Sequence, residues 1–140
     1  MAASRSFDVL LVEDSPEDVI LTQEAFEAQD FDATLHVVGD GEKAMRFLRA
    51  ASRKPDLVLL DLNLPRKSGL EVLDEMRADE SLAHIPVIML TSSAAQSDVQ
   101  AAYARGANAF VVKPLELDAF MDLIGSIRGF WLEVARLPSA

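Results

Sequence analysis

The segment Asp-Leu-Val-Leu-Leu-Asp-Leu-Asn-Leu-Pro-Arg-Lys-Ser-Gly, residues 56–69, decides the fold class. Its aliphatic run, residues 57–60, lies between Pro55 and a turn that contains proline and glycine. Such a run is typical of a strand that is buried on both faces of a parallel sheet. Asp61 follows at the predicted end of this strand, where ligands and reactive groups gather in open parallel sheets. Asp61 is therefore a candidate reactive carboxylate, although aspartate is also common where strands turn into loops.

The rest of the chain alternates between strand-like and helix-like apolar patterns. Short apolar runs predict further strands at residues 8–12, 34–38, 85–90 and 109–112. Apolar residues at helical spacing predict helices over residues 16–29, 42–51, 70–76 and 97–105, and from residue 115 or 116 onward. This alternation with short connections predicts right-handed βαβ crossovers. We expect one α/β domain over residues 1–140, in which 1–6 form a short tail and 128–140 extend the last helix.

The start of the first helix has a clear local signal. Ser15 can cap the helix, Pro16 suits its first turn, and two acidic residues follow at Glu17 and Asp18. We interpret these two carboxylates as partners of the positive end of the helix dipole.

Composition excludes several classes of function. A net charge of −10 and a pI near 4.5 argue against nucleic acid or an anionic membrane as a direct partner. The chain has no cysteine, which excludes disulfides and thiolate ligands. The two histidines, His36 and His84, are too few for a histidine-rich metal site, and we expect neither to be catalytic. The chain lacks a signal-peptide pattern and an apolar run long enough to span a membrane, so we expect a cytoplasmic protein.

Polar residues follow most of the predicted strands directly. Past the strand ends lie Glu13 with Asp14, Asp61 with Asn63, Thr91, and Lys113. Because the carboxyl ends of parallel strands meet at one edge of a sheet, we expect these side chains to form one site.

The chemistry of this set predicts magnesium binding and phosphoryl transfer. Glu13, Asp14 and Asp61 would repel each other unless a cation lay between them. Mg²⁺ prefers one or two carboxylates together with water and substrate oxygens. A metal, the Lys113 ammonium and the Thr91 hydroxyl around a carboxylate are the parts of phosphoryl transfer. We therefore expect Asp61 to be the nucleophile that forms an aspartyl phosphate.

At this point the chain resembles the receiver domains of two-component response regulators, over residues 7 to about 127. The motifs are Leu-Leu-Val-Glu-Asp-Ser at 10–15, Leu-Leu-Asp-Leu-Asn-Leu-Pro at 59–65, Met-Leu-Thr-Ser at 89–92 and Val-Val-Lys-Pro at 111–114. The resemblance implies a doubly wound, flavodoxin-like (βα)5 fold with strand order 2-1-3-4-5. It also implies that the protein is not an enzyme for an external substrate and catalyses only its own phosphorylation and dephosphorylation.

The resemblance assigns a role to each site residue. Asp61 matches the phosphoacceptor and Lys113 the cation that pairs with it and then with the phosphoryl group. Asp14, Asp61 and the backbone carbonyl of Asn63 would bind Mg²⁺, and Glu13 would act through water. Thr91 matches the switch hydroxyl and Phe110 the switch aromatic, although an apolar residue on a strand is also ordinary core.

A narrower resemblance concerns the partner. The stretches 63–69, 79–86 and 129–138 are similar to the receivers that serve phytochrome histidine kinases. This resemblance implies a phosphohistidine donor on a red-light-sensing sensor histidine kinase. We expect no attached effector domain and an output through contact with another protein.

The C-terminal end carries apolar residues beyond the part that the sheet is expected to cover. These residues are Phe130, Trp131, Val134 and Leu137. An apolar stripe without a covering layer suggests an intermolecular contact, so we expect a homodimer built partly on this helix.

Other functions fit the residues less well. A magnesium-dependent phosphohydrolase of the haloacid dehalogenase type would need a second acid where Asn63 stands. A flavodoxin-type electron carrier would need a phosphate-binding loop after the first strand, where this chain has acids. A receiver fold that is never phosphorylated is disfavoured because every part of the acceptor site is present. A phosphate sink or a phosphorelay intermediate stays open as an alternative to a signalling output.

Overall fold

A computed structural model describes the backbone of residues 7–29 and 33–134 and the side chains up to Trp131. Within these ranges, five parallel strands form one sheet in the order β2-β1-β3-β4-β5. The strands are β1 Phe7–Val12, β2 Ala33–Val38, β3 Leu57–Leu60, β4 Val87–Thr91 and β5 Ala109–Val112. The helices are α1 Pro16–Ala28, α2 Gly41–Ala50, α3 Gly69–Ala78, α4 Gln96–Ala104 and α5 Leu117–Ile127, followed by a π-helical segment, Arg128–Val134. The predicted doubly wound fold and strand order are confirmed.

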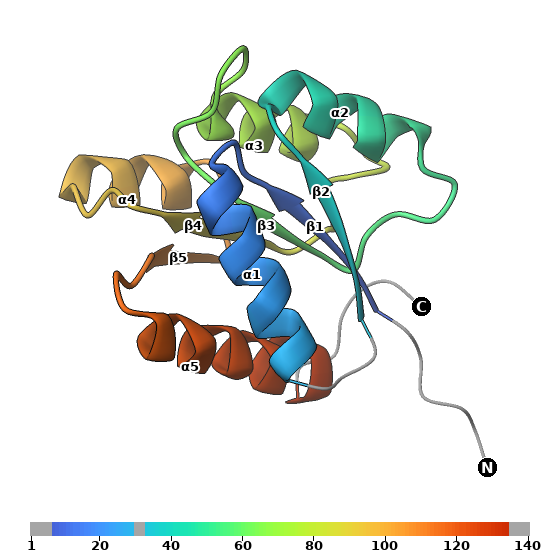
Figure 1. The fold of residues 1–140 in the computed structure, drawn as a ribbon. Coiled ribbons are helices and arrows are strands. Elements are labelled where there is room, and N and C mark those ends of the chain that lie inside the picture. Colours follow the sequence, from blue (N-terminus) through green and yellow to red (C-terminus); the bar gives the residue numbers. More distant parts are fainter. Residues whose placement is uncertain (1–6, 30–32, 135–140) are drawn as a thin grey trace.

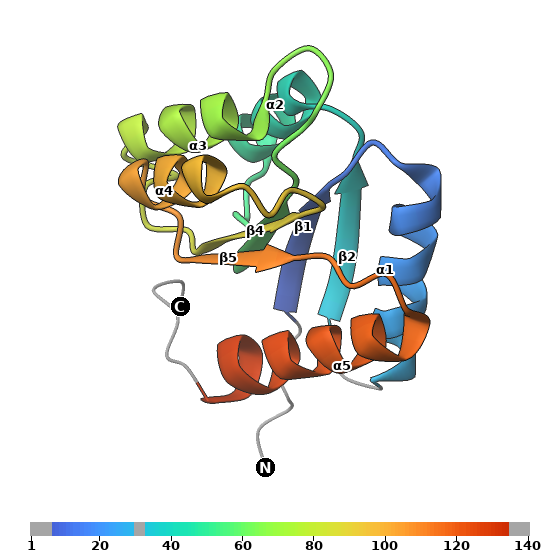
Figure 2. The same ribbon diagram turned by 90° about the vertical axis from the view of Figure 1, so that its left-hand side faces the viewer.

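Helices cover both faces of the sheet (Figure 1). One cluster of buried side chains joins β1, β3 and β4 to α2, α3 and α4, and its members include Leu48, Leu73 and Met76. Another joins the opposite face to α1 and α5 through Phe26, Phe120 and Ile124. Figure 2 shows α1 and α5 on one side of the strands and α2, α3 and α4 on the other. Because both faces of the central strands are buried, the reactive groups can only lie at the strand ends.

The helix starts follow the local sequence. The Ser15 side chain accepts a hydrogen bond from the amide of Asp18, and Asp40 does the same for Lys43 at the start of α2. Ser68 and Glu71 form a reciprocal capping box at α3. Each cap satisfies an amide that the helix leaves unpaired, a contribution of about 1 kcal/mol.

The structure differs from the prediction at β4. The strand begins at Val87, two residues later than predicted. The Ile85 amide donates to Leu82 in the preceding turn, and Pro86 has no amide hydrogen to pair with a neighbouring strand. The apolar run therefore starts two residues before the strand itself begins.

No helix in the part of the chain that the structure describes combines the length and the apolar character that crossing a lipid bilayer requires.

Candidate metal and phosphoryl site

The backbone ladder of the sheet continues one residue past the strands and so fixes the site. The Asp61 amide donates to the carbonyl of Val12 at 3.1 Å, and the Lys113 amide donates to the carbonyl of Thr91 at 2.8 Å. The Glu13 amide likewise donates to a β2 carbonyl at 3.0 Å. These bonds fix the main chain of the three residues at the carboxyl edge of the sheet.

Three carboxylates meet at this edge, and we call Glu13, Asp14 and Asp61 the acidic cup. One carboxylate oxygen from each lies within 4.8 Å of the others. Glu13 is 3% and Asp61 8% exposed, whereas Asp14 is open to solvent. Carboxylate oxygens at this separation are the ligands that hard divalent cations such as Mg²⁺ prefer. The donor set therefore fits the predicted metal, with Asp14 at its open side.

The Lys113 ammonium lies beside the acidic cup and is 7% exposed. Its Nζ contacts Oε1 of Glu13, lies 2.9 Å from Oδ2 of Asp18 and lies 3.2 Å from Oδ2 of Asp61. A lysine ammonium has three N–H donors, so three carboxylates use all of them. The structure thus brings Lys113 to Asp61, as predicted, but shares it with two other acids.

The two best-buried charges of the site have shifted pKa values. Burial raises the pKa of the Glu13 carboxyl to about 7; the contact with Lys113 opposes this shift and the charge of Asp61 adds to it. Burial by itself would lower the pKa of Lys113, but the carboxylates of Glu13, Asp18 and Asp61 outweigh burial and raise it. Lys113 therefore stays charged, and the site retains a proton on its acidic side more readily than isolated carboxylates would.

The loop after β3 is held against the acceptor residue. The amide of Gly69 donates to the carbonyl of Leu62 at 2.9 Å, and a Cβ at Gly69 would lie 2.1 Å from the carbonyl oxygen of Asp61. The Asn63 amide donates to Oδ1 of Asp61 at 3.4 Å. Arg66 adopts a positive φ of 68°, an uncommon conformation for a residue with a side chain. The Asn63 amide thus contacts the acceptor carboxylate, and metal binding by the Asn63 carbonyl stays a prediction.

Thr91 and Phe110 lie on the neighbouring strands β4 and β5. Thr91 is fully buried at the end of β4, where its hydroxyl accepts a hydrogen bond from the Ser93 amide at 3.5 Å. Phe110 is half-buried on β5 and packs against the cluster that α3 and α4 cover. Its amide donates to the Tyr103 hydroxyl at 3.1 Å, which ties β5 to α4.

Asp18 is a site residue that the sequence analysis missed. The helix-dipole interpretation accounts for its place in the first turn of α1, but its side chain pairs with Lys113, 95 residues along the chain. No pattern within the segment pointed to this contact, because Asp14 precedes α1 and the spacing along α1 does not show where the helix lies relative to Lys113.

The histidines lie outside the acidic cup, as predicted. His36 Nε2 is 3.0 Å from Oδ1 of Asp8, and its ring packs at 5.3 Å from Phe47, so His36 is structural. His84 is exposed in the turn before β4.

One premise of the dimer prediction is wrong. Trp131 does not stand clear of the core; it is half-buried and packs against the cluster beneath α1 and α5. The change from α to π geometry at Arg128 alters the angular spacing of side chains, so a stripe extrapolated at 3.6 residues per turn does not continue. Phe130 stays 55% exposed and meets Trp131 edge to face. The Val134 side chain and all of Leu137 lie outside the described residues.

Comparison with known proteins decides the family. The sequence profile of the response regulator receiver domain matches residues 9–125. The chain belongs to the response regulator receiver family. Among curated proteins, this receiver is 41% identical to the response regulator Rcp1 of Synechocystis sp. over 137 residues, which cover 94% of this chain and 93% of Rcp1. It is 34% identical to the probable methanogenesis regulatory protein FilR2 of Methanothrix harundinacea, over 99% of this chain and 92% of that protein.

Solved structures extend this likeness. The phosphorylated cyanobacterial phytochrome response regulator RcpA matches this receiver with a TM-score of 0.92 and 38% identity, over 96% of this chain and 100% of RcpA. The Mn²⁺-bound form of Rcp1 matches with a TM-score of 0.88 and 40% identity, over 95% and 99% of the two chains. The chain is thus a receiver similar to phytochrome response regulators.

Proposed function

We propose that this receiver accepts a phosphoryl group on Asp61 from the phosphohistidine of a sensor histidine kinase. The observation that carries the proposal is the contact of Lys113 with Asp61, which is one of three carboxylates whose oxygens lie within 4.8 Å of one another. A buried carboxylate with an ammonium and a cation site next to it is equipped for phosphoryl transfer, where positioning and charge stabilisation supply most of the catalysis.

In the proposed reaction an Oδ atom of Asp61 attacks phosphorus in line with the P–N bond of the donor. The P–O bond forms, the P–N bond breaks, and its electron pair returns to the donor imidazole. The Asp61 oxygen loses its negative charge when it bonds to phosphorus, and Lys113 then contacts the negatively charged phosphoryl oxygens. Asp14, Asp61 and the Asn63 carbonyl would hold Mg²⁺, with Glu13 acting through water; the bound ion supplies positive charge to the phosphoryl oxygens.

We further propose that phosphorylation is read through Thr91 and Phe110. The Thr91 hydroxyl accepts a hydrogen bond from the Ser93 amide, and the negative charge of the phosphoryl group would draw the hydroxyl away from it. The loop after β4 would then move, and Phe110, which is half-buried, would become fully buried. The bistable element would be this loop with the face formed by α4, β5 and α5.

We infer that the donor is a phytochrome-type kinase. The inference is supported by likeness to RcpA and Rcp1 over nearly their whole lengths. Phosphotransfer profiling against a set of histidine kinases, phytochrome kinases first, tests this choice of donor.

We also propose a homodimer that uses the exposed ring of Phe130, because a large exposed aromatic beside a second ring suits a contact between copies.

The acceptor is tested with a small phosphodonor. Incubation with phosphoramidate and Mg²⁺ should add one phosphate to the wild type, measured by intact-protein mass spectrometry, and none to Asp61→Asn. Asp118→Asn, which changes an exposed carboxylate at the start of α5, is the matched control and should be phosphorylated like the wild type. Phosphate on Asp61→Asn would refute the assignment.

A further inference from the structure

Asp18 contacts the site lysine from outside the acidic cup. Its Oδ2 lies 2.9 Å from Lys113 Nζ, closer than the 3.2 Å that separates this nitrogen from Oδ2 of Asp61. Asp18 is not among the three residues whose oxygens converge as possible metal ligands. The Lys113 ammonium is therefore held between two acids of the acidic cup and one acid that stands apart from it.

The main chain of Asp18 is fixed independently of its side chain. The Asp18 amide donates to the Ser15 hydroxyl at 3.4 Å, and its carbonyl accepts from the Thr22 hydroxyl at 2.7 Å. The carboxylate, 30% exposed, reaches from the first turn of α1 to the residue that follows β5. Asp18 and Lys113 both line a pocket that Ser92 and Pro114 also line, with a volume of about 390 Å³. The Asp18–Lys113 contact thus lies at the wall of a surface pocket, with the carboxylate more open to solvent than the ammonium.

A bound cation and Lys113 would share carboxylates of the acidic cup. Glu13 and Asp61 each belong to the acidic cup and each contact Lys113. A divalent ion that takes these carboxylates weakens their hold on the ammonium, and a buried ammonium without a partner is strongly unfavourable. Asp18 keeps its carboxylate whatever the acidic cup binds. Asp18 can therefore neutralise the charge of the Lys113 ammonium while the carboxylates of the acidic cup bind a metal.

We propose that Asp18 is a positioning residue that keeps the Lys113 ammonium at the mouth of the site and so lets the acidic cup bind its cation. The inference rests on the proposed function, since it concerns the same metal and phosphoryl site. Without Asp18, the ammonium would pair with Glu13 and Asp61 alone and would oppose the cation more strongly. The effect of Asp18 on cation binding must therefore require Lys113. A general effect of removing one negative charge would not require it.

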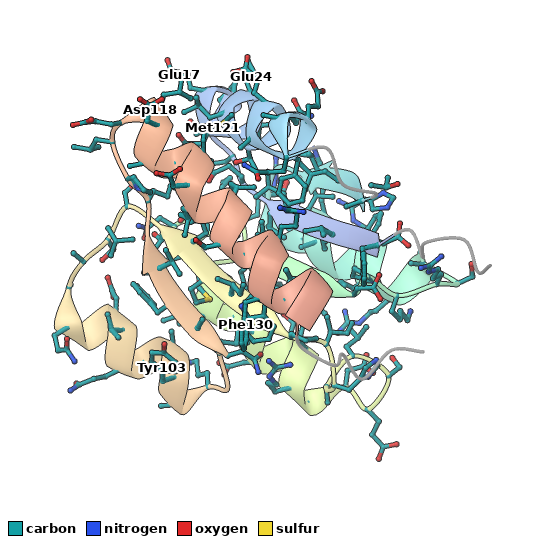
Figure 3. The ribbon with its side chains drawn as sticks, turned by 90° about the horizontal axis from the view of Figure 1, so that it is seen from below. Glu17, Glu24, Tyr103, Asp118, Met121 and Phe130 are labelled. Carbon is teal, nitrogen blue, oxygen red and sulfur yellow. The ribbon has the colours of Figure 1, made fainter. Side chains whose placement is uncertain are left out.

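The test measures Mn²⁺ affinity, using the ion that the solved Rcp1 structure contains. Free Mn²⁺ is counted by electron paramagnetic resonance in titrations of the wild type, Asp18→Asn, Glu17→Gln, Lys113→Met and the double variant Asp18→Asn/Lys113→Met. Glu17→Gln is the matched control because it removes the same charge from the same helical turn. Glu17 is exposed, and Figure 3 shows it at the outer edge of α1.

Asp18→Asn should weaken Mn²⁺ binding roughly fivefold, within the range of couplings between residues in contact. Glu17→Gln should weaken it by less than about twofold, as expected for a solvated charge. In the Lys113→Met background, Asp18→Asn should have no more effect than Glu17→Gln. If Lys113→Met does not fold, as judged by circular dichroism, Lys113→Gln replaces it, and the comparison of Asp18→Asn with Glu17→Gln remains decisive.

Equal weakening by the two single variants, or a full effect of Asp18→Asn without Lys113, would overturn the inference. Either result would leave the proposed function standing, because the wild type would still bind the ion and accept phosphate on Asp61. A wild type that binds no Mn²⁺ would instead remove the metal site and this inference together.

Discussion

The α-carbon of Gly69 lies against the main chain of Asp61, so that a methyl group on it would come within 2.1 Å of the Asp61 carbonyl oxygen. This oxygen belongs to backbone and cannot move aside without moving the acceptor residue. Gly69→Ala should therefore shift the loop after β3, lower the free energy of unfolding by about 1–3 kcal/mol and weaken cation binding. Urea denaturation and Mn²⁺ titration measure the two effects.

Gly39→Ala is the control for this substitution. A Cβ at Gly39 would meet nothing within 4 Å, so alanine should be tolerated there with little change in stability. Similar losses for both variants would mean that glycine itself, and not the contact with Asp61, matters at these turns.

The pKa of Glu13 predicts a dependence of stability on pH. Burial raises this pKa from 4.5 to about 7, so the folded protein binds the proton more tightly than the unfolded chain. The resulting stabilisation is complete below about pH 4.5 and is lost as the pH rises through about 7. Relative to Glu13→Gln, the metal-free wild type should lose roughly 2–3 kcal/mol of unfolding free energy across this window.

Urea denaturation at several pH values, in the presence of a chelator, measures this difference. Parallel stability curves for the wild type and Glu13→Gln would contradict the raised pKa. If the unfolding free energy of the wild type rose relative to that of Glu13→Gln with increasing pH, the pKa shift would have the opposite sign.

Arg77 joins the end of α3 to the turn before β4 and to the turn before β5. Its guanidinium donates to the side chain of Asn108 and to the carbonyl oxygens of Ala83, Ile85 and Gly106. Arg77→Met would leave these acceptors without their donor and should lower the unfolding free energy by about 2–4 kcal/mol. Arg46→Met is the control, because Arg46 is exposed on α2 without a partner among the described residues, and it should change stability by less than about 0.5 kcal/mol.

The neighbouring rings of Phe130 and Trp131 should have separable effects. Phe130 is exposed, so Phe130→Ala should shift the protein from dimer to monomer with little loss of stability. Trp131 packs on the core, so Trp131→Ala should lower the unfolding free energy by about 2 kcal/mol. Light scattering after size exclusion gives the mass, and urea denaturation gives the stability. A wild type that is monomeric at all concentrations would refute the dimer.

Local patterns in the sequence determined most of the fold and the centre of the site. The buried run of β3, the strand ends that carry Asp61 and Lys113, and the Ser15 cap are all properties of a few adjacent residues. Parallel strands bring their carboxyl ends to one edge, so the order of motifs along the chain was enough to predict that the acidic cup and Lys113 meet. The exact start of β4 was harder, because an apolar run does not reveal where its amides begin to pair.

Only the tertiary structure decided which acids share the lysine and where the last aromatic ring packs. Asp18 reaches Lys113 because of the angle at which α1 leaves β1, and no spacing within either segment encodes that angle. Trp131 turns to the core because the chain changes from α to π geometry at Arg128. Both contacts depend on how elements distant in sequence are oriented, whereas hydrophobic period and capping report only on the element in which they occur.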